Sequence, residues 1–156
     1  MAPLVDVLAR GEVLPFADES FDLVFCTQML EYVEQPKQVI VEIHRVLKRG
    51  GTLLLSVPSI APRDADEDAW RFLPAALRVL LRDFTQLQIQ SEGGTITGFF
   101  RTAAVSVHIF SRYRAAQVFV SYTLVPALNL VGAALEKIVG SSNDVLTANF
   151  SVQAIK

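Results

Sequence analysis

The fold class of this protein is decided by residues 21–57, which read FDLVFCTQMLEYVEQPKQVIVEIHRVLKRGGTLLLSV. Residues 21–26 are a short, nearly continuous apolar run, which predicts a strand buried on both faces. Residues 53–57 predict a second buried strand, which Pro58 ends. The apolar residues between these runs recur at helical spacing: Val39, Ile40, Ile43, Val46 and Leu47. A strand, a helix and a strand joined by short links predict a βαβ unit with parallel strands.

Local signals place the ends of the predicted helix. Pro36 suits a first helical turn, and Gly50-Gly51 supplies a left-handed stop just after a basic last turn. Further along the chain, a second helix is expected to begin at Pro74. Residues 86–90 alternate strictly between polar and apolar, which predicts a strand with one solvent-exposed face, near a sheet edge. Residues 150–155 alternate as well and predict a last strand, whereas residues 3–8 could form a strand stub.

A long apolar segment, residues 95–139, separates the last two predicted strands. It has helical character, is interrupted by Arg112-Tyr113-Arg114, and is expected to be kinked or broken at Pro126. Residues 115–135 carry no charge over a length that could cross a bilayer. Three interpretations stay open: a helical insertion packed over the sheet or a substrate pocket, a segment that contacts a membrane surface, and a true span.

Composition narrows the function classes. The 156 residues are 51% hydrophobic, with 14 basic and 16 acidic residues and a net charge of −2. No basic patch is present to follow a phosphate backbone, so nucleic acid is not an expected partner. The single cysteine, Cys26, excludes an internal disulfide and offers no metal-site spacing, which favours a reducing cytoplasm as the location.

The stretch LPFADESFDLV, residues 14–24, resembles the signature of the type 11 methyltransferase family. The order of later motifs is similar to that family too: MLEYV at 29–33, EIHRVLKRGG at 42–51, WRFLP at 70–74 and AIK at 154–156. The resemblance implies a class I, Rossmann-like α/β fold with parallel strands, a C-terminal antiparallel edge strand and the apolar helical insertion at 95–140, all within one domain over 1–156. It also implies S-adenosylmethionine as the cofactor and a small-molecule methyl acceptor.

The resemblance carries site residues onto this sequence as well. In an open α/β sheet, ligands bind outside the carboxyl ends of the strands. Cys26, Thr27 and Gln28 would lie near the methionine part of the cofactor, and Glu12 and Leu14 near the adenine. The position of the acid that the family places just upstream of "LPF" falls at Arg10 in this sequence, and Glu12 is near but out of register.

The family's glycine-rich cofactor loop has no counterpart, because no Gly-x-Gly-x-Gly stands anywhere in the sequence. On this ground we expect the chain to be an N-terminally truncated methyltransferase domain that is incompetent alone. The strand at 21–26 would then be an exposed sheet edge, open to self-association or to completion by another chain.

Candidate residues are weighed against ordinary structural roles. Trp70, Arg71 and Phe72 are the best candidates for acceptor binding, because aromatic residues near a crevice mouth both pack and bind. The acidic residues 64–68 are expected in a solvated loop over the site. Five other residues favour structural roles: Asp22 in a turn, Cys26 as an inert buried thiol, Glu31 and His44 on a helix, and His108 as a packed partner. No residue demands the role of a base, so none is assigned as catalytic.

Two rival functions remain. One is a non-catalytic methyltransferase-like remnant or binding module. The other is a membrane-associated protein that uses the apolar segment at 115–135. A nicotinamide dehydrogenase is disfavoured, since it also requires a glycine-rich turn.

Overall fold

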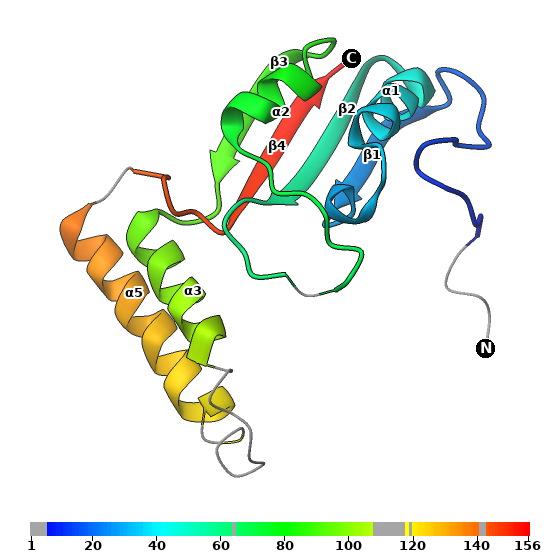
Figure 1. The fold of residues 1–156 in the computed structure, drawn as a ribbon. Coiled ribbons are helices and arrows are strands. Elements are labelled where there is room, and N and C mark those ends of the chain that lie inside the picture. Colours follow the sequence, from blue (N-terminus) through cyan, green and yellow to red (C-terminus); the bar gives the residue numbers. More distant parts are fainter. Residues whose placement is uncertain (1–5, 64, 108–117, 119, 141–142) are drawn as a thin grey trace. The chain divides into compact units, whose positions relative to one another are not determined.

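A computed structural model describes residues 6–63, 65–107, 118, 120–140 and 143–156 of the chain (Figure 1). The strands are β1 (Phe21–Thr27), β2 (Leu47–Pro58), β3 (Thr85–Ser91) and β4 (Asn149–Ile155). The α-helices are α1 (Pro36–Val46), α2 (Pro74–Leu80), α3 (Thr95–Val107) and α5 (Val125–Val139). A 3₁₀ turn, η1 (Leu30–Tyr32), and a π-helical turn, η3 (Val120–Leu124), complete the described elements. The predicted α/β fold class is confirmed.

The four strands form one sheet in the order β1-β2-β4-β3. β1 and β2 are parallel, with Cys26 opposite Leu55 and Thr27 opposite Ser56, which confirms the predicted βαβ unit. Lys156 exchanges backbone hydrogen bonds of 3.0 Å with the glycine pair at the start of β2, while Ser59, just past the end of β2, donates to Ala148. β4 therefore runs antiparallel to β2. β4 lies between β2 and β3, so the prediction that the last strand is an edge strand is wrong. The edge strand on this side of the sheet is β3.

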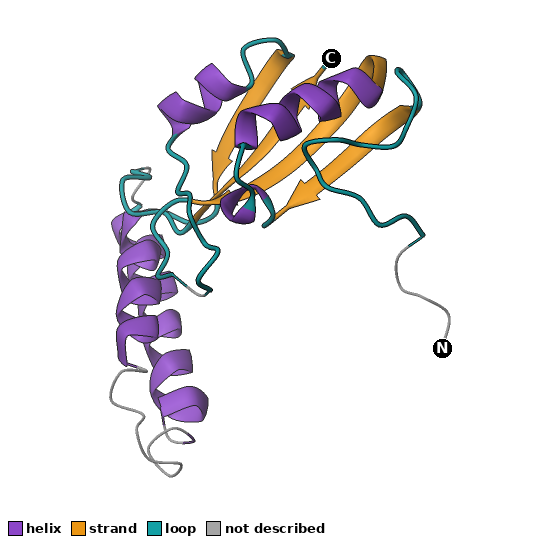
Figure 2. Cartoon of the chain, turned by 45° about the vertical axis from the view of Figure 1, so that its right-hand side comes forward, coloured by secondary structure: helices purple, strands orange, loops and turns teal. Residues whose placement is uncertain are grey.

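Two helices cover one face of this sheet. α1 and α2 lie side by side on the same face (Figures 1 and 2). Fully buried side chains of the strands and helices in this part of the chain include Val39, Val46, Leu53, Val57 and Leu77. The other face of β1 is not covered by α1 or α2: Leu23 is 44% exposed and Phe25 is 66% exposed. The expectation that β1 is buried on both faces is therefore wrong. As expected, β1 is instead an edge strand of the described sheet.

The chain divides into two compact units. The first comprises residues 1–57, 67–89 and 152–156, and the second comprises residues 58–66 and 90–151. The predicted insertion at 95–140 lies within the second unit.

The second unit is built on the packing of α3 against α5. A Cβ atom on Gly132 would lie 2.8 Å from the Cβ of Phe100, so this glycine lets the two helices approach closely. The Glu136 carboxylate accepts a 2.7 Å hydrogen bond from the backbone N–H of Thr97, which places a negative charge at the N-terminus of α3. The helix does not break at Pro126: the π-helical turn η3 continues directly into α5. His108, Arg112-Tyr113-Arg114 and residues 3–5 of the predicted strand stub lie outside the described residues, and residues 6–8 form no strand.

The link between α1 and β2 differs from the prediction. α1 ends at Val46 and β2 begins at the next residue, so Gly50-Gly51 lies inside the strand and does not stop the helix. Gly50 has a left-handed φ of +77° with open space around it, whereas a Cβ on Gly51 would lie 2.8 Å from the Lys48 carbonyl oxygen.

Replacement of the two glycines with alanine is therefore expected to lower the free energy of unfolding by different amounts. Gly50→Ala should lower the free energy of unfolding by about 1 kcal/mol, the cost of a left-handed backbone with a Cβ. Gly51→Ala should lower it by about 2–3 kcal/mol, because the backbone atoms that a methyl group would meet cannot rotate away. Urea unfolding of the two variants measures the difference, and equal losses would contradict the close approach at Gly51.

Candidate functional site

The carboxyl ends of β1 and β2 form the crevice edge where the sequence placed the cofactor. Gln28, directly after β1, has a left-handed φ of +48°, which is uncommon for a residue other than glycine. Its backbone N–H donates to the Ser56 carbonyl oxygen at 2.9 Å, and its Nε2 donates to the Ser56 hydroxyl at 2.9 Å. Sparsely populated backbone conformations of this kind cluster at ligand sites, because the surrounding structure must hold them in place.

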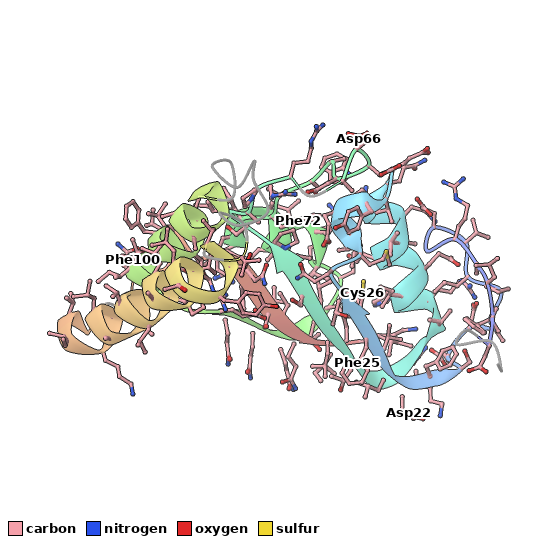
Figure 3. The ribbon with its side chains drawn as sticks, turned by 90° about the horizontal axis from the view of Figure 1, so that it is seen from below. Asp22, Phe25, Cys26, Asp66, Phe72 and Phe100 are labelled. Atoms are coloured by element: carbon pink, nitrogen blue, oxygen red, sulfur yellow. The ribbon has the colours of Figure 1, made fainter. Side chains whose placement is uncertain are left out.

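Cys26 lies beside this turn, and its surroundings favour the protonated thiol over the nucleophilic thiolate. The side chain is 4% exposed. Burial, with a smaller contribution from the negative charge of Glu31, raises the pKa of the Cys26 thiol to about 12. Its place on β1, next to the exposed Phe25, is shown in Figure 3. The thiol is therefore protonated at neutral pH and contributes an apolar wall.

A pocket of about 610 Å³ opens next to this crevice edge, in the first unit. One wall comes from the segment before β1, including Glu12 and Leu14, and the other from residues 29–34 after β1, including Met29 and Tyr32. Two of the predicted cofactor residues thus line a single pocket. Thr27 and Gln28 immediately precede its second wall, although they do not line it.

Glu12 supplies the negative charge in this pocket. It is 9% exposed, and the Arg10 Nε lies 3.5 Å from its Oε2. The backbone N–H of Glu12 itself, and then the Arg10 guanidinium, hold the pKa of the carboxyl below its usual value. Glu12 is therefore an ionised hydrogen-bond acceptor in a pocket that also contains Arg10, Glu34 and apolar side chains, and its carboxylate can accept hydrogen bonds from hydroxyl or amino groups.

The wall before β1 is held in place by an arginine that the sequence analysis did not single out. All five N–H donors of Arg45 form hydrogen bonds. Within the helix, Nε and Nη2 donate to the Glu42 carboxylate at 2.9 and 2.8 Å. Toward the segment before β1, Nη2 donates to the Leu14 carbonyl at 3.0 Å, and Nη1 donates to the Phe16 carbonyl at 2.8 Å and to Asp18 at 2.7 Å. The Leu14 backbone N–H donates to Glu42 at 2.8 Å. We call Glu42 and Arg45 the clamp. It explains physically why the "LPF-x-D" and "E-I-x-R" motifs occur together.

The candidate acceptor residues are held mainly by structural contacts. Trp70 is 42% exposed, and its Nε1 donates to the Val33 carbonyl at 2.8 Å. Arg71 forms an ion pair with Asp68, at 2.6 Å between Nη2 and Oδ2. Phe72 is 5% exposed and belongs to the core. The backbone N–H groups of Ala69 and Trp70 donate to the Glu31 carbonyl oxygen. Of the three candidates, Trp70 therefore offers the most surface for a ligand.

Three further residues have identifiable structural roles. Asp22 does not cap a turn: its carboxylate binds Lys48 Nζ at 2.9 and 2.8 Å. His44 packs edge-to-face on Phe84, with ring centroids 5.0 Å apart. Lys156 Nζ donates to the Leu47 carbonyl at 2.6 Å, where a cation neutralises the C-terminal end of α1. Within the described ranges, no three acids, histidines or cysteines come together as a metal site.

Comparison with known proteins agrees with this geometry. Residues 3–55 match the model of a family described as a methyltransferase domain, and this segment contains the clamp and most of the pocket. This segment, about a third of the chain, is therefore similar to a type 11 methyltransferase domain. The pocket and the clamp both lie within the part of the chain that shows this similarity.

Relatives and solved structures resemble this chain over different lengths. It is 37% identical over 82 residues to the ubiquinone/menaquinone biosynthesis C-methyltransferase UbiE of Klebsiella pneumoniae, covering 49% of this chain and 33% of UbiE. It is 47% identical over 51 residues to an uncharacterised protein of Methanocaldococcus jannaschii, covering 33% of this chain and 25% of that protein. The chain thus spans a quarter to a third of the length of these relatives.

Solved structures resemble the chain over nearly its whole length. The [4+2]-cyclase SpnF has a TM-score of 0.53 at 22% identity, covering 96% of this chain and 54% of that one. A Haloferax volcanii putative methyltransferase complex with the Trm112 activator has a TM-score of 0.54 at 18% identity, covering 96% and 59%. At such identities the likeness shows the fold, and the first example shows that the fold alone does not fix the reaction.

Proposed function

We propose that this chain takes part in methyl transfer from S-adenosylmethionine to a small, apolar acceptor. The observation that carries the proposal is the pocket beside the carboxyl end of β1, with an ionised Glu12 paired with Arg10 and apolar side chains such as Leu14 and Met29 in its walls. Glu12 and Leu14 would hold the adenosine, and the strained turn at Gln28 would face the methionine part.

The chain's own residues would mainly bind and orient. The cofactor supplies an already activated methyl group, so the protein needs to align donor and acceptor and exclude water. Trp70 offers an aromatic surface for an apolar acceptor. None of the described side chains is assigned as a base.

The test is a titration of the ¹⁵N-labelled chain with S-adenosylhomocysteine, followed by NMR. Because the 156 residues contain no Gly-x-Gly-x-Gly loop, we expect weak binding by the chain itself, which NMR detects at millimolar ligand. Amide resonances of residues 9–16 and 27–34 should shift. Glu12→Lys should abolish these shifts, because it places a cation where the adenosine donors would bind.

Val79→Ser is the matched control, since this residue of α2 is 71% exposed and lies outside the pocket. It should leave the titration unchanged. Absence of shifts in both segments would favour the alternative of a methyltransferase-like remnant that does not bind the cofactor. Shifts of equal size in Glu12→Lys would contradict the role of Glu12 in holding the adenosine.

A further inference from the structure

The outer face of α5 is apolar and has no protein partner among the described residues. Residues 127, 130, 131, 134 and 138 share this face by their spacing of three and four, and all five are apolar and exposed. Leu130 is 72% exposed and Ile138 is 79% exposed. The opposite face carries Gly132 and Glu136, which contact α3 (Figure 3 labels Phe100, the partner of Gly132). The apolar stripe is therefore not the surface that holds the two helices together.

The helix is also long enough and apolar enough to interact with lipid. Residues Val120–Val139 form one 20-residue helix with a mean hydropathy of 1.3, of which 6% is buried. A continuous exposed apolar stripe of this kind marks an interaction surface rather than an ordinary solvated face.

The charges on the two helices indicate which partner the stripe fits. The described residues of α3 and α5 carry two basic residues, Arg101 and Lys137, and one acid, Glu136, whose carboxylate is used at the start of α3. The chain as a whole has a net charge of −2, so this pair of helices is basic within an acidic protein. An apolar helical face with basic neighbours is the combination that binds an anionic lipid surface.

The structure disfavours a helix that crosses the bilayer. The backbone N–H of Thr95, at the start of α3, donates at 2.8 Å to the carbonyl oxygen of Asn143, just after α5. The start of α3 therefore lies beside the end of α5. If α5 spanned the membrane, α3 would have to enter it as well, with Arg101 in its middle. A charge at the bilayer centre is costly, whereas in the interface Arg101 can reach the headgroups.

We propose that α3 and α5 bind as a pair to the surface of a membrane containing anionic phospholipids, with the outer stripe of α5 inserted among the acyl chains. This inference goes beyond the proposed methyl transfer and does not depend on it, because vesicle binding can be measured without cofactor.

Sedimentation with vesicles tests the proposal on the full chain. We expect the protein to sediment with vesicles of equal phosphatidylglycerol and phosphatidylcholine, to bind less to pure phosphatidylcholine, and to be released by salt. Leu130→Ser/Ile138→Ser should weaken partitioning at least about 30-fold, because the inserted apolar area is lost. Both residues are exposed, so the thermal unfolding midpoint should stay close to that of the unmodified chain.

Leu73→Ser/Val79→Ser is the matched control, since these residues are 57% and 71% exposed but lie in the first unit. It should bind vesicles like the unmodified chain. The proposal is overturned if neither kind of vesicle binds. It is also overturned if sedimentation equilibrium shows a dimer that only the α5 variant dissociates, because the stripe would then be an interface between copies.

Discussion

Replacement of Arg45 with lysine is expected to lower the midpoint of thermal unfolding by roughly 3–8 °C. Arg45 uses every N–H donor of a planar fork, on one carboxylate of its own helix and on three groups of the segment before β1. An ammonium group has three donors and no fork, so it cannot make both sets of bonds. Loss of the bonds to Leu14 and Phe16 would free the pocket wall. Circular dichroism melting measures the effect.

The same clamp should be sensitive to acid. Hydrogen bonds from Arg45 and from the Leu14 backbone N–H lower the pKa of Glu42 to about 2, from an ordinary value of 4.5. Its stabilising contribution is therefore complete above about pH 4.5 and is lost as the pH falls towards 2. Glu42→Gln, which removes the charge, should lower the free energy of unfolding by about 1–3 kcal/mol at pH 7 and much less near pH 2.

Lys48→Gln is the control for these two variants. It removes the ion pair with Asp22, whose side chains are 46% and 83% exposed, and exposed pairs contribute less than about 1 kcal/mol. If Lys48→Gln lowered the midpoint of thermal unfolding as much as Arg45→Lys does, the hydrogen bonds of the clamp would contribute no more to stability than an ordinary surface contact.

The order of the strands and helices could be predicted because each has a periodicity that its neighbours do not share. The α1 pattern predicts a helix and the alternation in β3 predicts a half-exposed strand, and both are confirmed. The end of α1 could not be predicted, since Leu47 continues the helical spacing and is buried equally well as the first residue of β2. Position in the sheet was also not readable: an apolar strand such as β1 gives no sign of whether one or both faces are covered.

The site was predictable only where sequence neighbours are also spatial neighbours. Glu12 and Leu14 are two residues apart and line one pocket, whereas their contact with an adenine stays a prediction. The clamp joins residues about 30 positions apart, and a charged residue on a helix face ordinarily indicates only solvent. The presence of both motifs, "LPF-x-D" and "E-I-x-R", in one chain was the signal that could have found it. Lys156 was missed for the same reason, because its bond to Leu47 joins residues 109 positions apart.

Cys26 should react with iodoacetamide at pH 8 at least about 1000-fold more slowly than an exposed cysteine, since the thiolate fractions differ by about 2500-fold. An exposed thiol with a pKa near 8.5 is about one quarter thiolate at that pH, and burial raises the pKa of Cys26 to about 12, so its thiolate fraction is about one in ten thousand. Mass spectrometry of the native chain measures the rate, with Val79→Cys in a Cys26→Ser background as the exposed control. Denaturant should restore full reactivity. Fast labelling of the native chain would instead indicate an activated thiol at the carboxyl end of β1, and Cys26 would then be a candidate to accept the methyl group itself.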